Sequence, residues 1–201
     1  RAVEPHRQRA GQRRFADNRN SHLPYLSRSN LSAAKLLTFY PKAPRNDSAP
    51  AKNFFPSAAA AKEDRSLDEV ADIAQKYADS MATIAVAARC ATHPANGSEF
   101  GDLGDVDMEI GMGQHGEGGG GRQPMKTAQE TIRIMADALI KDLELKSDDK
   151  VFVMINGSGA TTLMEMWILY KDCVHYLESL GIKVVANMVG EILTVQEQAG
   201  F

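Results

Sequence analysis

A single histidine, His115, stands among glycines in the stretch 109–121. Gly113 and Gly116 remove side-chain bulk around it, so a small ligand can approach both the imidazole ring and the backbone. Near neutral pH an imidazole serves as a base, a nucleophile or a metal ligand. Glu117 is close enough in sequence to orient the ring or to accept a hydrogen bond from a ligand hydroxyl. The alternative is a solvent-exposed histidine in a surface loop, and spacing alone does not separate the two.

The glycines at 111, 113 and 116 also match the pattern G-x-G-x-x-G of dinucleotide-binding proteins. That fingerprint requires a helix to begin at its last glycine, so that free amides meet the pyrophosphate. Here further glycines and Pro124 precede the next helix signal, at Thr127. We therefore reject a dinucleotide site.

A second glycine-rich turn, 156–159, has the sequence Asn-Gly-Ser-Gly and follows a predicted strand. Its amides could cradle an anion. We favour a simpler interpretation, a tight turn that needs glycine for its geometry. In the helix that follows, we expect Met164, Met166 and Trp167 in the core and His175 on the surface, and we assign none of them a functional role.

Three capping boxes predict where the helices that position these loops begin. They open at Ser66, Thr127 and Thr162, each with a glutamate three residues later. The expected helices cover 66–81, 127–145 and 162–180. Apolar residues at three- and four-residue steps predict one buried stripe on each helix. The stripes are Val70, Ile73, Ala74, Tyr77 and Met81; Ile132, Met135, Ala136, Leu139, Ile140 and Leu143; and Leu163, Met166, Trp167, Tyr170, Val174 and Leu177.

Short apolar runs predict strands at 83–88, 151–155 and 182–189. The run 151–155 is continuous, which is typical of a strand in a sheet covered on both faces. Strand–helix–strand alternation indicates the α/β class, with a mostly parallel or mixed sheet and flanking helices. The chain ends on an apolar pair, Gly200-Phe201, and we expect the sheet to be incomplete there.

Composition is that of a globular protein, with 43% hydrophobic and 24% charged residues, but charge divides the chain. Residues 1–62 hold 12 Lys and Arg against three acids, a net charge of +9, whereas 63–201 carry −12. We expect 1–62 to be an irregular basic segment without a core and 63–201 to be the folded domain. The segment resembles a transit peptide or a nucleic-acid arm. A disordered or mistranslated leader is favoured over both, because its leucines and aromatics follow no amphipathic spacing.

The two cysteines, Cys90 and Cys173, belong to no C-x-x-C pair or zinc-type cluster, and we expect two reduced thiols. The sequence contains no apolar run long enough for a membrane span and shows no signal-peptide core. These features predict a cytoplasmic protein with neither a membrane nor a nucleic acid among its partners.

The loop 109–117, Glu-Ile-Gly-Met-Gly-Gln-His-Gly-Glu, resembles the substrate-binding loop of the dihydroxyacetone kinase family, whose pattern reads roughly E-[IV]-G-x-G-x-H-G-E-P-G. Other matching segments follow in the family's order and spacing: 66–70, the strand ending at Cys90, 104–108, 153–161, 163–165, Gly190 and 199–201. The resemblance covers about residues 58–201. It corresponds to the C-terminal half of the family's substrate-binding subunit or domain.

This resemblance implies that His115 attacks the carbonyl carbon of a short ketose, such as dihydroxyacetone, and holds it as a covalent hemiaminal. The attack needs a neutral ring with a free lone pair and a fixed tautomer. Gly113, Gly116 and Glu117 are implied to line the same site. Phosphate then comes from a separate nucleotide-binding domain or subunit, which carries ATP and Mg²⁺, or from a phosphotransferase-system donor. The sequence contains no P-loop, and we expect no cofactor or metal on this chain; full-length members of the family are implied to be homodimers.

Two departures from the family pattern limit what the resemblance implies. Gly118 replaces the usual proline, and the four glycines 118–121 predict a more mobile loop and weaker binding. The family's first half, which supplies a second histidine and an aspartate, is not recognisable in 1–57. We therefore expect weak or no ketose binding and no phosphorylation by this chain alone.

Three functions stay open at this stage: the substrate-binding part of a kinase, a non-catalytic ketose sensor or coactivator of the same fold, and a nonfunctional remnant. Gln114, 190–191 and 194–198 are similar to the branch of the family that acts on erythrulose. Erythrulose is therefore a second ketose to consider.

Overall fold

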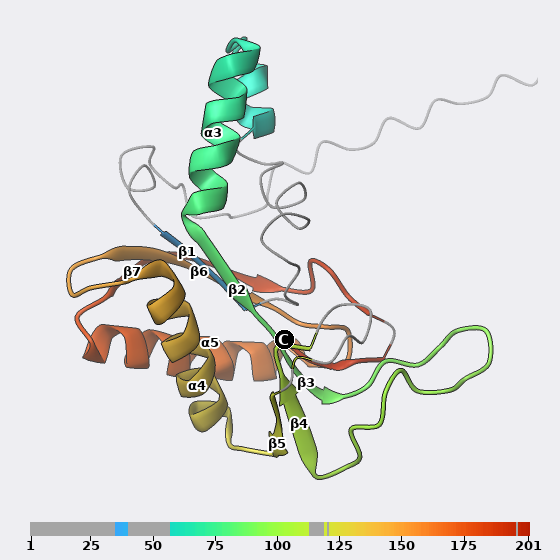
Figure 1. Cartoon of the computed structure of the whole chain (residues 1–201). Helices are drawn as coiled ribbons and strands as arrows, with labels where there is room; N and C mark the ends of the chain where they lie inside the picture. The colour runs from blue at the N-terminus through green and yellow to red at the C-terminus, as the bar shows by residue number, and fades with distance from the viewer. Residues whose placement is uncertain (1–34, 40–56, 113–118, 120, 196) are drawn as a thin grey trace, which may run out of the picture.

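The computed structural model describes residues 35–39, 57–112, 119, 121–195 and 197–201. The strands in these ranges form two four-stranded sheets (Figure 1). In chain order the elements are β1 Lys35–Phe39, α3 Leu67–Asp79, β2 Met81–Ile84, β3 Val86–Arg89, β4 Asp107–Ile110, β5 Gly121–Pro124, α4 Ala128–Leu143, β6 Lys150–Asn156, α5 Leu163–Ser179, β7 Lys183–Gly190 and β8 Ala199–Gly200. The predicted α/β class is confirmed.

The first sheet is parallel, with the strand order β2-β1-β6-β7. Figure 1 shows α4 crossing α5 below the strands of this sheet, and the two helices contact each other and the strands. Val151, Val153 and Ile155 alternate along β6 as fully buried residues, whereas Phe152 and Met154 between them are half-buried. The main core therefore lies between this sheet and the two helices, and the other face of β6 is less completely covered than the sequence predicted.

The second sheet is antiparallel, with the order β5-β4-β3-β8. The strand predicted at 83–88 is divided between the two sheets, because the chain leaves β2 at Ala85 and enters β3. The Ala85 carbonyl accepts from the amide of Gly111 at 2.7 Å, while Val86 exchanges two backbone hydrogen bonds with Phe201, at 2.9 and 3.1 Å. Both contacts belong to the second sheet. The chain therefore passes from the first sheet to the second at Ala85.

All three predicted helices are present, and all three capping boxes are formed, with N-caps at Ser66, Thr127 and Thr162. In α4 the predicted stripe is correct, with Ile132, Met135, Ala136 and Leu139 buried and Ile140 and Leu143 packed against them.

The stripe predicted on α5 is partly wrong. The buried residues of this helix are Met166, Leu169, Cys173 and Leu177. Leu163, Met164 and Trp167 are instead 55%, 72% and 45% exposed. The helix is apolar around most of its circumference near its start, so the pattern did not fix which face packs on the sheet. His175 lies on the surface, as predicted.

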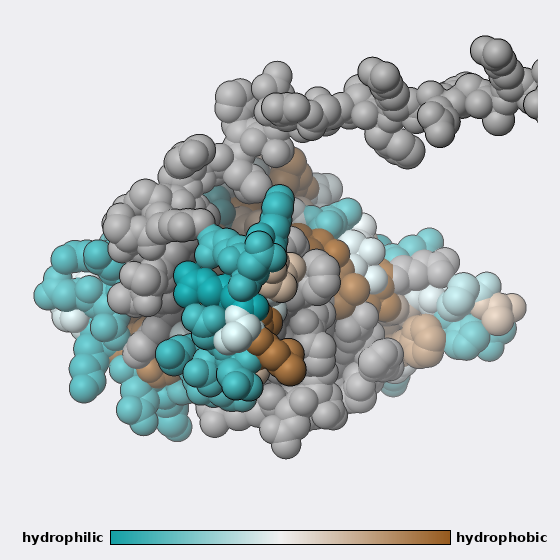
Figure 2. Space-filling view, turned by 90° about the horizontal axis from the view of Figure 1, so that it is seen from above, coloured by the Kyte–Doolittle hydropathy of each residue, from teal (hydrophilic) through white to brown (hydrophobic). Residues whose placement is uncertain are grey.

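Helix α3 differs from the other two because none of its residues is fully buried, and its apolar stripe Val70, Ile73, Ala74 and Tyr77 is only half-covered. The helix projects away from both sheets in Figure 1. Figure 2, which looks down from above, shows a hydrophilic surface in this region with hydrophobic residues exposed beside it.

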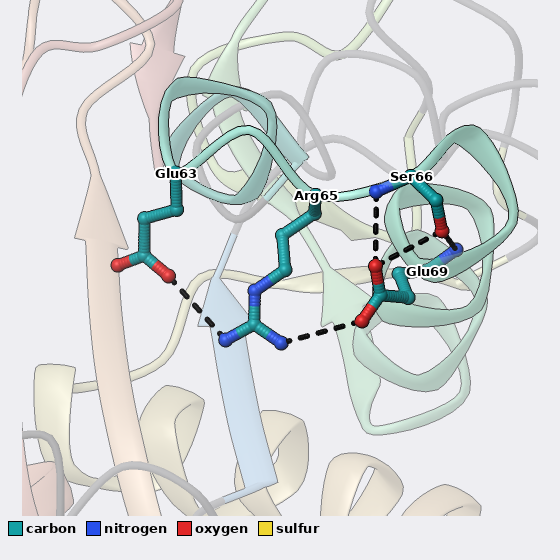
Figure 3. Close-up of polar contacts among 4 residues, drawn as sticks. All are labelled: Glu63, Arg65, Ser66 and Glu69. Atoms are coloured by element: carbon teal, nitrogen blue, oxygen red, sulfur yellow. Dashed lines mark hydrogen bonds and ion pairs between the residues drawn. The ribbon is translucent and has the colours of Figure 1, made fainter.

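The start of α3 is held by local polar contacts (Figure 3). Glu69 accepts from the amide and the hydroxyl of Ser66, both at 2.9 Å. Arg65 lies between Glu63, at 3.5 Å, and Glu69, at 3.6 Å. Because these groups are exposed, each ion pair contributes little; the cap itself defines where the helix begins.

The expectation of an irregular segment over 1–62 is wrong at two places. Lys35–Phe39 forms β1, which lies inside the parallel sheet between β2 and β6, with Leu37 fully buried. Residues 57–62 are helical. The lack of amphipathic spacing was misleading here, because a strand paired on both sides inside a parallel sheet need not alternate between apolar and polar residues. The rest of the segment lies outside the described residues, so a domain boundary at residue 62 stays a prediction.

None of the helices in the described ranges is long and apolar enough to cross a membrane.

Candidate functional site

The glycine-rich stretch joins β4 to β5 as the loop of an antiparallel hairpin. Ile110, the last residue of β4, is opposite Gly121, the first residue of β5. The next helix does not begin until Ala128. The strand–glycine–helix context of a dinucleotide site is therefore missing, which confirms the rejection of that site.

The base of this hairpin is closely packed. Gly111 has a φ of +85°, a conformation that favours glycine, and its backbone lies against that of Gly119. A Cβ at Gly119 would overlap the carbonyl of Gly111, and one at Gly121 would overlap the carbonyl of Ile110. Glu109 Oε1 accepts the Gly119 amide at 2.6 Å. Glycine at 119 and 121 thus permits close packing, where the sequence suggested only mobility.

The predicted site residues Gly113, His115, Gly116 and Glu117 lie outside the described residues, as do Gln114 and Gly118. Their roles stay predictions. The structure does define the two limbs between which they are placed, β4 through Met112 on one side and Gly119 with β5 on the other.

A small apolar cluster lies at the first limb of the hairpin. It consists of Ala87, Cys90, Leu103 and Met112, all at most 5% exposed. Gln198, also 5% exposed, reaches this cluster and points its Nε2 at the Met112 sulfur, 3.6 Å away. No pattern in the sequence predicts this contact, because the two residues are 86 positions apart.

Two arginines tie the surrounding segments together. Arg122 donates to the Asp107 carboxylate at 3.0 Å and to the carbonyls of Asp102 and Leu103 at 2.5 and 3.2 Å. Arg89 donates twice to the carbonyl of Glu197, at 3.1 and 3.3 Å. The acidic segment before β4 and the segment before β8 are therefore both fixed to the antiparallel sheet.

The Asn-Gly-Ser-Gly turn 156–159 is a tight turn and not an anion cradle. The amides of Gly157, Ser158 and Ala160 all donate to carbonyls of the chain itself, at 3.0–3.1 Å. A Cβ at Gly157 would lie 2.7 Å from the sulfur of Met166, and one at Gly159 would lie 2.7 Å from the carbonyl of Val195. The protein's own atoms fill the space that an anion would need.

A separate cavity of about 340 Å³ lies between the starts of α4 and α5 and the antiparallel sheet, with mostly apolar lining. Three of its four polar side chains are already engaged: Thr131 donates to the Thr127 carbonyl, Thr161 to the Gly200 carbonyl, and Glu165 belongs to a capping box, which leaves only Lys126. A polyhydroxylated ligand needs several free polar groups, so this cavity does not suit a ketose.

Both cysteines are free and buried, and no group of His, Cys, Asp and Glu in the described ranges could hold a metal ion. Burial raises the pKa of Cys173 from its ordinary 9.0 to about 12, and burial also raises the pKa of Cys90. Both thiols are therefore neutral and unreactive while they stay buried.

Comparison with known proteins agrees with this architecture. Residues 56–201 match the family model of the Dak1 domain, so the chain belongs to the Dak1 domain family. Its relatives include the dihydroxyacetone-binding subunit DhaK of the PTS-dependent dihydroxyacetone kinase 1 from Listeria innocua, 34% identical, covering 71% of this chain and 43% of the relative. The DhaK subunit of the PEP-dependent kinase of Escherichia coli is 28% identical, covering 71% of this chain and 47% of the relative. The chain thus spans less than half the length of these relatives.

Solved structures share the fold. The dihydroxyacetone kinase operon co-activator Dha-DhaQ superposes with a TM-score of 0.70 at 24% identity, covering 75% of this chain and 46% of that one. The dihydroxyacetone kinase from C. freundii, in complex with AMP-PNP and Mg²⁺, gives a TM-score of 0.60 at 23% identity, covering 72% of this chain and 26% of that one.

Proposed function

We propose that this chain is the ketose-binding part of a dihydroxyacetone kinase and that His115 holds the ketose. The observation that supports this most strongly is the match of 56–201 to the Dak1 domain together with relatives named as dihydroxyacetone-binding subunits. The hairpin between β4 and β5 adds support, because its tightly packed base fixes the two ends of the loop that carries the histidine. A loop on a rigid base is a common place for a binding residue.

The proposed step is an addition. A neutral imidazole nitrogen of His115 forms a bond to the carbonyl carbon, the carbonyl π pair moves to its oxygen, and that oxygen gains a proton while the ring loses one. The product is a hemiaminal that keeps every atom of the ketose. Glycerol has no carbonyl carbon to attack, so the step selects ketones.

Phosphate transfer requires a second component. We propose a nucleotide-binding domain or subunit with ATP and Mg²⁺, or a phosphotransferase-system protein, as donor; relatives named PTS-dependent and PEP-dependent, and a kinase solved with AMP-PNP and Mg²⁺, support both routes. This chain by itself is expected to bind ketose weakly and to transfer no phosphate. A homodimer and a cytoplasmic location belong to the same proposal.

Native mass spectrometry of the chain with dihydroxyacetone or erythrulose tests the histidine. We expect an adduct equal to one intact ketose, because hemiaminal formation releases no water, whereas a lysine Schiff base would. His115→Ala should abolish the adduct, and His175→Ala, which removes an exposed histidine on α5, should not. An adduct that survives His115→Ala would refute the role of His115.

A sensor or co-activator is the alternative, and the co-activator Dha-DhaQ shows that the fold is compatible with it. A coupled assay with a nucleotide-loaded kinase partner separates the two. Phosphorylation in such a mixture favours the kinase and would also overturn the expected inactivity of this chain. Because no phosphate transfer is expected in either case, ketose binding without phosphorylation favours the sensor only when the chain also binds a transcription regulator. A chain with neither property is a remnant.

A further inference from the structure

The side chain of Gln198 is buried without full hydrogen bonding. It is 5% exposed, and its Oε1 has no hydrogen-bond partner in the described part of the chain. Its Nε2 meets only the sulfur of Met112, which is a weak acceptor. Exchanging the two ends of the amide would put oxygen against sulfur, which offers that oxygen no hydrogen bond, so the orientation with Nε2 at Met112 is the one that forms a contact.

An unpaired buried carboxamide destabilises a folded protein, and most buried polar groups are paired for this reason. A methionine or leucine would fill the same space beside Met112 without that cost. A buried polar group without a partner in the protein is expected where a ligand supplies that partner.

The backbone beneath this side chain is rigid. The Gln198 carbonyl accepts from the Ala160 amide at 3.0 Å, and its own amide donates to Val195 at 3.2 Å. The preceding carbonyl, of Glu197, is held by Arg89. The carboxamide is therefore carried by a fixed segment to the first limb of the hairpin, at Met112.

Other polar side chains near the hairpin are already used. Glu109 accepts the Gly119 amide, and Arg122 holds Asp107 and two carbonyls. Asn156, although fully buried, is satisfied by the backbone of Ile192 and Leu193. Gln198 differs from these residues in having hydrogen-bonding capacity left over.

We propose that Gln198 is a specificity-determining residue whose carboxamide binds one hydroxyl group of the ketose. The proposal rests on the ketose-binding function stated above and extends it to a residue outside the histidine loop. A carboxamide both accepts and donates, so it suits a hydroxyl, which does the same. It carries no charge, and a neutral polyol needs none. A site built to bind a hydroxyl discriminates against a ligand that lacks it.

Gln198→Met tests this, because methionine has similar length and no amide. Dissociation constants for dihydroxyacetone, which has two hydroxyls, and hydroxyacetone, which has one, are measured by NMR titration on the full chain. The unaltered chain should prefer dihydroxyacetone on the order of tenfold, the effect of one hydrogen bond. The variant should bind the two alike, because only one hydroxyl position remains. Gln123→Met, a half-buried glutamine in β5, is the matched control and should keep the preference.

The melting temperature of the ligand-free proteins gives a second readout. Gln198→Met should raise it, since the variant removes an unpaired buried group; a structural glutamine would lower it on replacement. Retention of the tenfold preference in the variant, or a lowered melting temperature, overturns the role of Gln198 and leaves the ketose function standing. If the unaltered chain binds neither ketone, the proposed function fails, and the role of Gln198 fails with it.

Discussion

The two sheets of this chain are built differently. The parallel sheet has long apolar strands, and with α4 and α5 it forms the large core that includes Ile132, Met135, Val153 and Leu177. The antiparallel sheet has strands of two to four residues; its Val86, Met108 and Ile110 join the large core, and the separate buried cluster beside it has only four members. Close backbone packing at glycines and hydrogen bonds from Arg89 and Arg122 hold it together.

This difference suggests that the two sheets have different roles, one in stability and one in ligand binding. Large buried apolar area supplies most of the stability of a domain, whereas short strands and loops tolerate the unpaired groups that ligands require. The candidate ketose loop joins two strands of the antiparallel sheet, and the unsatisfied Gln198 and Gly111, with its positive φ, are each directly next to one of its strands in the chain. The parallel sheet would then be the scaffold, and the antiparallel sheet the part that binds.

The largest expected effect tests the scaffold. Ile132→Ala in α4 removes a fully buried side chain from the main core and should lower the free energy of unfolding by about 2–5 kcal/mol. Ile134→Ala, two residues further on and 37% exposed, is the matched control and should cost less than about 1 kcal/mol. Chemical denaturation measures both. Equal losses would mean that stability is not concentrated beneath the parallel sheet.

The scaffold was also the part that the sequence predicted well. Capping boxes at Ser66, Thr127 and Thr162 and continuous apolar runs at 151–155 and 182–189 are local signals, and each produced the expected element. Local signals did not show which face of α5 packs, because Leu163 and Trp167 are as apolar as the residues that are buried. They also missed β1, whose role depends on pairing with β6 more than a hundred residues away.

The antiparallel sheet depends on contacts between distant segments, and the sequence predicted little of it. The pairing of β3 with β8, the division of one strand at Ala85 and the contact of Gln198 with Met112 all join residues far apart in the chain. The glycines were visible in the sequence, but their close approach to Gly111 and Ile110 was not. The pattern of one histidine among glycines singled out the loop, but only the resemblance to a family assigned it a function.

A somewhat smaller effect tests the base of the hairpin. Gly119→Ala should lower the free energy of unfolding by about 1–3 kcal/mol, because the new methyl group overlaps the backbone of Gly111. Gly190→Ala is the control: no atom lies within 4 Å of its added Cβ, so the change should be close to neutral. Thermal melting compares the two variants. If Gly119→Ala is as mild as its control, the base of the hairpin is looser than described.

Each of the two buried clusters contains one cysteine, whose alkylation rate reports how often that cluster opens. Cys173 lies in the large core and Cys90 in the small cluster. Both thiols are buried and protonated, so alkylation requires local opening. We expect Cys90 to be alkylated at least about tenfold faster than Cys173, a difference of about 1.4 kcal/mol in opening free energy. Peptide mass spectrometry of the unaltered protein, sampled over time, resolves the two rates. Equal rates would show that both sheets open as one unit.

The smallest effect concerns the ionisation of Cys173, whose pKa burial raises from 9.0 to about 12. Below pH 9 the thiol is protonated in both the folded and the unfolded chain, and its contribution to stability is constant. Between pH 9 and 12 the unfolded chain loses this proton while the folded chain keeps it, so stability falls as pH rises. From pH 8 to pH 10 the free energy of unfolding should fall by about 1 kcal/mol more in the unaltered protein than in Cys173→Ala. Denaturation under reducing conditions at the two pH values measures this difference, and the tyrosines, which titrate in both proteins, cancel from it. An identical decline in the two proteins would mean that the core around Cys173 can hold the charged thiolate. The large core would then be less strictly apolar than the burial of Cys173 indicates, and it would differ less from the antiparallel sheet.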